Sequence, residues 1–311
     1  MKKLFLVLVK VIALFLVVTS IVMGLSTIYI RVLRGQNEYF SSMPYGIELA
    51  NTGSSHGRDA FNYDNVKFKA FNFAMSAQSL QYDYSLVDFY RDHFAKGSVL
   101  IIPVSYISFW YNDDTDNDTN VRYISVLDAD HMHFQTTSDY YLYKYFSAIT
   151  APDRFIKTII KEVTPNPVIK DPSLADYTIE EIGELRAKYH LSLGIYLDGK
   201  VQPIHKDDKT ALEKLVKLCL DNDITPILVT TPYLEYYTKW WPDEVLEVIR
   251  ENILDVADEF GIQYWDYSHD GRFINNTKLF SDSDHLNKAG SKLFTKIIID
   301  RVAPIGDFPP Y

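Results

Sequence analysis

Three side chains from two distant places in the sequence could act together as a nucleophile, a base and an orienting acid. Ser55 lies in the turn-like segment Gly53-Ser54-Ser55-His56, and Asp282 precedes His285 by three positions near the other end. A serine hydroxyl becomes nucleophilic when an imidazole takes its proton and a carboxylate fixes the tautomer of that imidazole. In a turn, residues three apart point to one side, so Asp282 can hold Nδ1–H of His285 and leave Nε2 for Ser55. We therefore predict a catalytic set of Ser55, Asp282 and His285.

The segments around both motifs alternate between buried strands and amphipathic helices. Continuous apolar runs or alternating patterns predict strands at 47–51, 66–73, 99–104, 224–230 and 262–267. Helical spacing predicts helices at 80–94, from a capping box at 210–213, from 242 to a C-terminal glycine at 261, and at 288–302. This order predicts an α/β fold, a parallel sheet covered by helices on both faces. Ligands bind such sheets at the carboxyl ends of the strands, where both motifs fall.

The motifs resemble those of the SGNH hydrolase superfamily. Gly-x-Ser opens the domain, Asp-x-x-His precedes the last helix, and residues 72–78 are similar to the second block, usually Asn-x-x-x-x-Gly. The layout resembles a membrane-anchored branch that includes the D-alanyl-lipoteichoic-acid transfer proteins and the alginate-type O-acetyltransferases. That branch ends in Asp-x-x-His-Leu-Asn-x-x-Gly, here residues 282–290. The resemblance covers most of residues 45–302 in order but only about four short motifs, and it implies a three-layer, flavodoxin-like SGNH fold without a cofactor.

The donors for an oxyanion depart from the family pattern. Ala77 stands where the second block usually has glycine, and Pro103-Val104-Ser105-Tyr106 replaces the third block, usually Gly-x-Asn-Asp. The candidate donors are the backbone N–H of Ala77, the hydroxyl of Ser105 and the side-chain amide of Asn72. Loss of one donor costs about 100- to 1000-fold in rate at a comparable site. The alternatives are therefore a weak or specialised enzyme and a non-catalytic envelope scaffold that keeps the fold.

Several side chains beside the motifs are candidates for substrate binding or for simple packing. His56 could line the site or be a hydrogen-bonded surface histidine, whereas Asp284 is expected to face solvent or to cap the last helix. Tyr233 and Trp240 follow the strand at 224–230, where aromatic rings could stack on sugars or pack against an insertion.

No metal site is predicted. The acidic run Asp114-x-Asp116-x-Asp118 has the alternating spacing of a calcium loop, but Thr119 occupies the position that needs glycine. The chain has a single cysteine, Cys219, which excludes both an intrachain disulfide and a zinc site built on cysteines.

The N-terminus predicts a membrane anchor. Residues 11–30 form a 20-residue stretch without a charged side chain, long enough for a bilayer core that needs about 20 helical residues. We expect an anchor at 1–34, a polar stalk at 35–44 and an extracytoplasmic domain at 45–311 with an insertion at about 111–206. A cleaved signal peptide is the alternative, and a buried soluble helix is the third interpretation.

The composition narrows the partners. With 31 basic and 41 acidic residues the formal net charge is −10, and an acidic chain without a basic stripe is a poor candidate for binding nucleic acid. Together with the resemblance, the anchor predicts a cell-membrane protein that transfers acyl groups on a cell-envelope glycan or teichoic-acid-like polymer. Whether the acceptor is water or a polymer hydroxyl stays open. A partner subunit of a polytopic membrane acyltransferase is a further alternative.

Overall fold

The computed structural model describes residues 2–110, 120–163 and 177–306 of the 311-residue chain. The acidic run at 114–118 lies outside these residues. Two compact units are present: Met1–Ser42 with Asp113–Ile169, and Met43–Asn112 with Lys170–Tyr311. The predicted insertion at 111–206 is thus divided, because its first part belongs to the unit of the N-terminal helix and its second part to the unit of the sheet.

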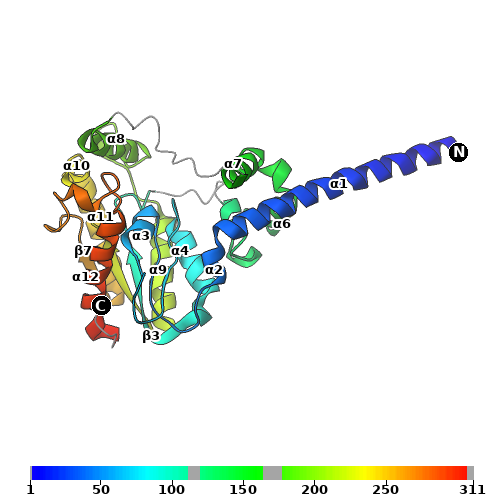
Figure 1. Ribbon diagram of the computed structural model, residues 1–311. Helices are drawn as coiled ribbons and strands as arrows, with labels where there is room; N and C mark the ends of the chain where they lie inside the picture. Colours follow the sequence, from blue (N-terminus) through cyan, green and yellow to red (C-terminus); the bar gives the residue numbers. More distant parts are fainter. Residues whose placement is uncertain (1, 111–119, 164–176, 307–311) are drawn as a thin grey trace. The chain divides into compact units, whose positions relative to one another are not determined.

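The sheet unit is built on five parallel strands in the order β2-β1-β3-β6-β7, of which β3 and β7 are labelled in Figure 1. Their bounds are Ile47–Asn51 for β1, Ala70–Asn72 for β2, Phe94–Pro103 for β3, Ile224–Thr230 for β6 and Gln263–Asp266 for β7. Counted along the chain, this is the order 2-1-3-4-5 of flavodoxin-like sheets. The predicted α/β class and parallel sheet are confirmed, although β2 is shorter than the predicted strand at 66–73.

Helices cover both faces of the sheet. On one face α3 (Ser55–Ala60) packs against α12 (Lys288–Gly306), and on the other α9 (Lys206–Asp221) contacts both α4 (Leu80–Phe89) and α11 (Asp243–Phe260). Alternate strand residues supply the core under α12, since successive side chains of a strand point to opposite faces. The buried members of this core include Leu49, Val99, Ile101, Ile227, Val229, Phe294 and Ile298.

Two helix boundaries test the local signals. Helix α9 begins at Lys206, so the prediction of a start at the Thr210 capping box is wrong. Asp207 and Asp208 lie in its first turn, where carboxylates favour the positive end of the helix. The predicted end of α11 is confirmed, because Gly261 has φ +65°, the left-handed conformation of a C-terminal glycine.

The same unit contains a further group of elements outside the sheet. It consists of α8 (Ile179–Ser192), the antiparallel pair β4 (Tyr196–Leu197) and β5 (Lys200–Val201), and α10 (Glu235–Thr238). Helices α8 and α10 meet closely, because a Cβ on Gly183 would lie 2.3 Å from the carbonyl oxygen of Tyr236. This contact fixes α8 to α10, the short helix that follows β6.

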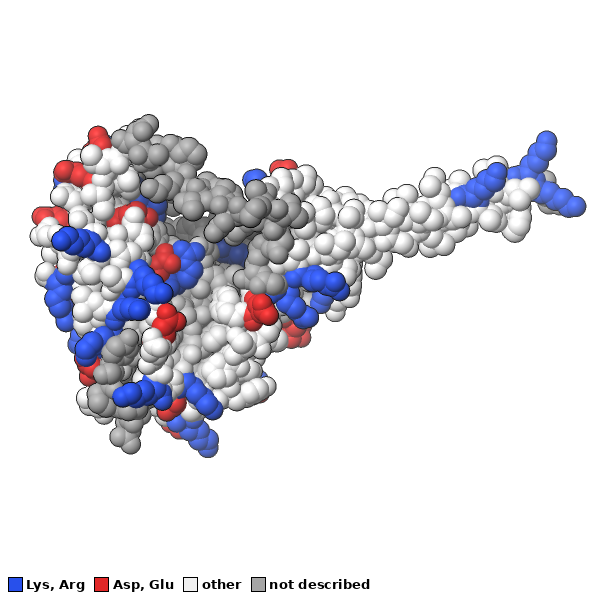
Figure 2. All heavy atoms as spheres, in the orientation of Figure 1, with Lys and Arg blue, Asp and Glu red and all other residues white. Residues whose placement is uncertain are grey.

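The other unit is organised around α1 (Lys2–Gln36). Residues 11–30 of this helix carry no charged side chain, and Figure 2 shows a long uncharged stretch along it. The helix is long and apolar enough to cross a membrane. Helices α6 (Thr137–Thr150) and α7 (Pro152–Val163) pack against it in this unit. The predicted stalk is partly helical: α1 extends to Gln36, and α2 covers Glu38–Ser41.

Candidate active site

The structure brings Ser55, His285 and Asp282 together. Ser55 Oγ lies 2.8 Å from Nε2 of His285, and Nδ1 of His285 lies 3.0 Å from each carboxylate oxygen of Asp282. These distances fall within hydrogen-bond range. With Nδ1–H donating to Asp282, Nε2 is the acceptor for the Ser55 hydroxyl. The arrangement can move a proton from the serine to the imidazole while the carboxylate holds the ring.

Ser55 is held by the turn that joins β1 to α3. The side chain of Asn51, at the end of β1, donates to the carbonyl oxygen of Gly57 at 3.3 Å, and the N–H of Gly53 donates to Asp83 at 2.9 Å. A Cβ on Gly57 would lie 2.3 Å from the carbonyl oxygen of Thr52. Only a glycine therefore allows α3 to start so close to the strand end, which puts Ser55 at the carboxyl edge of the sheet.

His285 is held by the loop before α12. Oδ1 of Asp282 accepts from the backbone N–H of Asp284 at 3.1 Å and of His285 at 2.8 Å. The side chain of Asn287 accepts from the N–H of Gly290 at 3.1 Å, which caps α12, and donates to the carbonyl oxygen of Lys278 at 2.8 Å. The segment 282–290 is thus one hydrogen-bonded unit that ties the imidazole to the start of the last helix.

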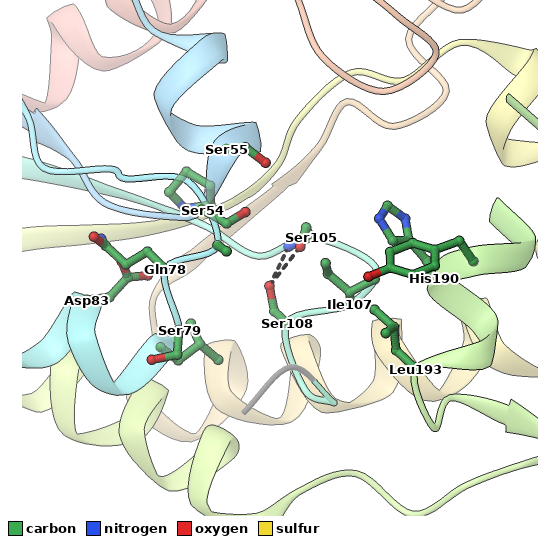
Figure 3. Close-up of a pocket in the computed structure, with 14 residues that line it drawn as sticks. Ser54, Ser55, Gln78, Ser79, Asp83, Ser105, Ile107, Ser108, His190 and Leu193 are labelled. Carbon is green, nitrogen blue, oxygen red and sulfur yellow. Dashed lines mark hydrogen bonds between the residues drawn. The ribbon is translucent and has the colours of Figure 1, made fainter. Parts of the chain in front are cut away.

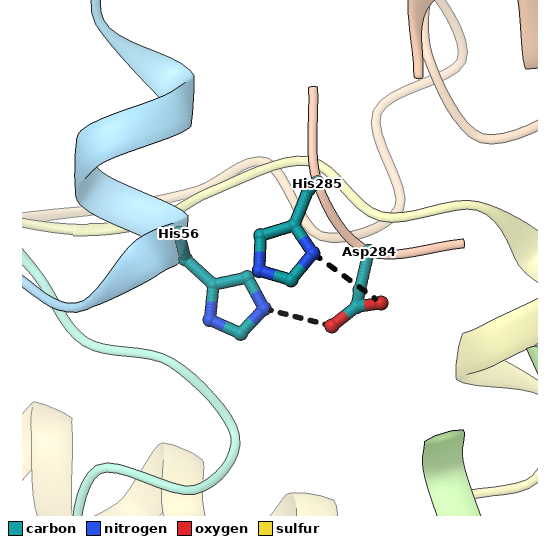
Figure 4. Close-up of side chains that lie close together, drawn as sticks. All are labelled: His56, Asp284 and His285. Atoms are coloured by element: carbon teal, nitrogen blue, oxygen red, sulfur yellow. Dashed lines mark hydrogen bonds and ion pairs between the residues drawn. The ribbon is translucent and has the colours of Figure 1, made fainter. Parts of the chain in front are cut away.

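A buried pair, His56 and Asp284, lies next to His285. His56 and Asp284 are 4% and 1% exposed, so the expectations of a surface histidine and a solvent-facing acid are wrong. Nε2 of His56 lies 3.1 Å from Asp284, and its ring is stacked on that of His285 with centroids 4.8 Å apart (Figure 4). Arg186 of α8 reaches the same carboxylate, with Nε 2.6 Å from Oδ1 of Asp284. The loop folds this way because a buried carboxylate needs opposite charge and donors around it.

The charges around this pair set three pKa values. Burial alone would raise the pKa of Asp284, but His285, His56 and Arg186 outweigh it and hold that pKa well below its ordinary value. Burial would lower the pKa of His285, but Asp284 and then Asp282 outweigh it and raise that pKa above 6.5. For His56 burial prevails and its pKa is lowered. The lowered pKa favours the neutral form of His56, and the raised pKa means an increased proton affinity of His285.

His56, Asp284 and His285 also offer ligand atoms within 4.8 Å of one another. A cation would have to share the Asp284 carboxylate with the guanidinium of Arg186 and displace the hydrogen bond from His56. The positive charge already present opposes a metal ion here. The three residues fit a charge network around a base better than a metal centre.

A cavity of about 190 Å³ opens next to Ser55 (Figure 3). It is smaller than the roughly 300–1,000 Å³ of pockets for drug-sized ligands. Its wall contains the turn after β1, the segment after β2, the segment after β3 and helix α8. The lining residues include Ser54, Ser55, Ala77, Gln78, Asp83, Pro103, Ser105, Ile107, Ser108, His190 and Leu193.

Two of the three candidate oxyanion donors line this cavity. Ala77 has φ +50°, a conformation typical of the glycine that it replaces. Oγ of Ser105 lies 3.0 Å from Oγ of Ser108, which also accepts from the N–H of Ser105 at 2.9 Å. If the Ser108 hydroxyl donates to Ser105, the Ser105 hydrogen can point into the cavity.

The prediction of Asn72 as an oxyanion donor is wrong. Its amide group donates to the carbonyl oxygens of Arg58 at 3.2 Å and Phe61 at 3.4 Å, and its oxygen accepts from the side chain of Asn51 at 2.9 Å. The amide joins the ends of β1 and β2 to α3 and to Phe61, the residue that follows it. Its role in this structure is to hold the turn that carries Ser55.

The two aromatic candidates for substrate binding do not line the cavity. Tyr233 is fully buried, and its ring centroid lies 5.3 Å from that of His56 and 4.8 Å from that of Tyr106. Of the two interpretations of this residue, the structure therefore favours packing over stacking on a sugar. Trp240 is 36% exposed and lies near the ammonium groups of Lys188 and Lys239. Neither residue belongs to the wall around Ser55.

Three residues of the site, Asp284, Arg186 and His190, were not predicted from the sequence. Asp284 is adjacent to His285, and a second acid beside a candidate base was a usable signal. Arg186 and His190 lie on α8, in the part of the predicted insertion without a recognised motif. Nδ1 of His190 lies 2.8 Å from the hydroxyl of Tyr237, and burial lowers the pKa of His190 from 6.5 to about 4. No spacing in the sequence relates α8 to the loop before α12.

Comparisons with known proteins complete the description. No family profile and no curated protein matches the chain. Among solved structures, a protein of Bacteroides fragilis NCTC 9343 named as an acylhydrolase aligns with TM-score 0.39 and 12% identity, over 86% of this chain and 93% of its own. A GDSL-like lipase of Bacteroides thetaiotaomicron VPI-5482 aligns with TM-score 0.38 and 10% identity, over 89% of this chain and 98% of its own.

Proposed function

We propose that this chain is a serine acyl-ester hydrolase or O-acyltransferase of the SGNH type, which works through an acyl-enzyme on Ser55. The observation that carries the proposal is the continuous path from Ser55 Oγ through His285 to Asp282, with separations of 2.8 Å and 3.0 Å. The path opens on a cavity at the carboxyl edge of a parallel sheet, where such folds bind their ligands.

In the first half-reaction Ser55 attacks the carbonyl carbon of an acyl ester. Its proton passes to Nε2 of His285 as the Oγ–C bond forms, and Asp282 stabilises the resulting imidazolium. The tetrahedral intermediate then collapses, the bond to the alcohol oxygen breaks, and His285 gives its proton to the leaving alcohol. The products are a free alcohol and an ester of Ser55.

In the second half-reaction an acceptor hydroxyl takes the acyl group. The acceptor gives its proton to Nε2 of His285 as its oxygen attacks the acyl carbon, and the proton then returns to Oγ of Ser55. With water as acceptor the product is a carboxylic acid, and with a polymer hydroxyl it is a new ester. The chemistry of Ser55 and His285 is the same in both cases.

The negative oxygen of the intermediate needs hydrogen-bond donors. Ser105 supplies one, because its hydroxyl lies in the cavity wall. When the Ser108 hydroxyl donates to Oγ of Ser105, the hydrogen of the Ser105 hydroxyl is left for the intermediate. The backbone of Ala77 is the second candidate position, on the strength of its glycine-like conformation and its place in the wall. Asn72 is not a donor to this oxygen, because its amide group donates to the carbonyl oxygens of Arg58 and Phe61.

The proposed setting is the outer face of a cell membrane. Helix α1 has the length and apolarity of a span, and the resemblance to the membrane-anchored branch points to a cell-envelope glycan or teichoic-acid-like polymer as substrate. A cavity of about 190 Å³ fits a short acyl group better than a long chain. A polytopic membrane acyltransferase as acyl donor belongs to the same proposal.

A serine-reactive fluorophosphonate probe tests the nucleophile. We expect the full chain to be labelled, and both Ser55→Ala and His285→Ala to lose labelling, because the first removes the oxygen and the second removes the base that activates it. The matched control is Ser54→Ala: Ser54 lines the same cavity, precedes α3 and makes no side-chain cap hydrogen bond. It should be labelled like the unaltered protein.

Hydrolysis of a short-chain nitrophenyl ester gives the rate. Ser55→Ala should lose about a thousandfold or more, as in other serine enzymes that lose the nucleophile. A folded protein that takes no label and cleaves no ester would contradict the proposal and favour a non-catalytic scaffold. Transfer of a radiolabelled acyl group to an added envelope polymer would separate transferase from esterase.

A further inference from the structure

Helices α6 and α7 carry an exposed apolar surface in the unit of α1. Its members are large, they lie on two consecutive helices, and their side chains are between 43% and 62% exposed. They are Tyr141, Leu142, Tyr145, Ile149, Ile156 and Ile160. A helix on the surface of a soluble unit normally turns its apolar side inward and its polar side to water. Here apolar side chains are on the outside, which marks a surface with a partner.

The same helices use other side chains to pack against α1. Ser147 of α6 is fully buried, and the N–H of Ala148 donates to Oγ of Ser26 at 3.3 Å. The ring of Phe155 in α7 lies 5.5 Å from that of Tyr29. The exposed apolar surface is therefore what remains after the packing on α1 has been satisfied.

The contacts lie near the end of the uncharged run of α1. Ser26 precedes Ile30, the last residue of that run, by four positions, which is about 6 Å along a helix axis. Amphipathic helices that lie in the membrane interface are buried about 5–10 Å deep. Helices α6 and α7 are thus attached to α1 at the depth where a spanning helix leaves the hydrocarbon.

We propose that α6 and α7 bind the lipid surface around α1, with the six exposed side chains in the boundary between headgroups and acyl chains. The inference rests on α1 spanning the bilayer. The composition suits this boundary: Tyr141 and Tyr145 combine an apolar ring with a hydroxyl, as in aromatic belts, and the isoleucines reach toward the chains. Lys157, exposed beside Ile156, can reach lipid phosphates. A folded protein partner would not require this depth.

Site-specific fluorescence tests the proposal in the full chain. Single cysteines at Tyr145→Cys and Ile156→Cys are labelled with an environment-sensitive dye and reconstituted into phosphatidylcholine–phosphatidylglycerol vesicles. The native Cys219 stays unlabelled in the folded protein, because it is buried and burial raises the pKa of its thiol. We expect blue-shifted emission at both positions and loss of most of it with lipids that carry a nitroxide near the headgroup.

Two further positions make the result decisive. Leu220→Cys, on α9 of the sheet unit and 45% exposed, is the control for a solvent-exposed position and should be quenched by aqueous iodide. Leu14→Cys, within the uncharged run of α1, should be quenched by nitroxides carried on the acyl chains. Quenching at Leu14 but not at positions 145 and 156 overturns the proposal and leaves the anchor intact. No lipid quenching at Leu14 overturns the anchor itself, and a blue shift at 145 and 156 without lipid quenching means that a protein covers the surface.

Discussion

The imidazole of His285 lies between two carboxylates, and both favour its protonated form. Asp282 is 3.0 Å from Nδ1, and the buried Asp284 is 3.8 Å from the same atom. Asp284 keeps its charge because Arg186 and His56 surround it. A more basic imidazole takes the serine proton more readily but is itself protonated over a wider range of pH.

The pH profile of ester hydrolysis should follow from this arrangement. His285 acts as a base only when neutral, and its pKa is raised above 6.5. We therefore expect kcat/KM to reach its maximum at alkaline pH, where His285 is neutral. It should decrease as the pH falls through the raised pKa of His285. Asp284→Asn removes the strongest of the interactions that raise it, so its acid limb should move to lower pH.

Asp284→Asn also leaves Arg186 without its buried partner, so a loss of stability is expected as well. Thermal melting keeps the two effects apart, and rates are compared only where both proteins are folded. The matched control is Asp270→Asn, an acid paired with Arg272 and not part of the cavity wall. An unchanged acid limb in Asp284→Asn would contradict the electrostatic role.

At this scale the sequence predicted the three relay residues, Ser55, His285 and Asp282, and the contacts between them. It named His56 as a possible lining residue, but it did not predict the second layer of charges in which Asp284, His56 and Arg186 lie together. The relay residues occur in short motifs whose spacing has a geometric meaning. The second layer depends on α8 reaching a loop about 100 residues away in sequence, and on which of two neighbouring acids is buried.

At the scale of elements, the site depends on how closely α3 approaches the end of β1. Gly57 allows this approach, and Asn51, Asn72 and Asp83 hold the turn through side-chain hydrogen bonds. The nucleophile is thus positioned by the backbone of two elements as well as by its own rotamer. A small displacement of α3 would lengthen the 2.8 Å contact between Ser55 and His285.

Gly57→Ala tests this approach. An alanine in a helix normally stabilises by about 1 kcal/mol relative to glycine, but here its Cβ would meet the carbonyl oxygen of Thr52 at 2.3 Å. We expect destabilisation by about 1–3 kcal/mol, typical of overpacking, together with lower ester hydrolysis. The urea midpoint, followed by tryptophan fluorescence, measures the first effect.

Gly271→Ala is the control, because a Cβ at Gly271 meets nothing within 4 Å and its φ lies outside the left-handed range. Its midpoint should change little. Equal midpoints for Gly57→Ala and the unaltered protein would show that α3 can move without cost.

Elements were predictable where one local signal dominated. The apolar run of β6 predicted this strand with its bounds, because a strand buried on both faces is largely apolar. The bounds of β1 were predicted as well, although this strand carries Glu48 and Asn51. The start of α9 was misplaced, since acids upstream of the capping box extended the helix by about one turn. The partition of the insertion between two units could not be predicted, because it depends on tertiary contacts with α1.

At the scale of the whole molecule, the two units differ in how they can be observed. All four tryptophans, at positions 110, 240, 241 and 265, lie in the sheet unit. Tryptophan fluorescence therefore reports unfolding of the unit that carries the site, whatever the state of α1. This makes the pH dependence of that unit accessible in the full chain.

His190 should make the sheet unit sensitive to acid. The unfolded chain binds a proton at this residue near pH 6.5, whereas the folded unit does so only near pH 4. The contribution of the neutral His190 to the free energy of unfolding is complete above pH 6.5 and is lost as the pH falls toward 4. At pH 5 this loss amounts to about 2 kcal/mol. His190→Gln keeps a hydrogen-bonding group for Tyr237 and does not titrate, so its urea midpoint should fall less between pH 7 and pH 5.

His56 and His285 titrate in both proteins, with pKa values shifted in opposite directions, so the difference between the two proteins isolates His190. Parallel pH dependences for the unaltered protein and His190→Gln would contradict the buried, neutral state of this ring.

Helix α8 touches the site in two ways. Arg186 sets the charge beside the base, and His190, with Leu193 just beyond the helix end, forms part of the wall around the acyl position. One rigid segment therefore links proton affinity to steric fit. Under the proposed function, we expect a change that shifts α8 to alter turnover and acyl-chain preference together, so that selection for a new acyl group would also adjust the optimal pH.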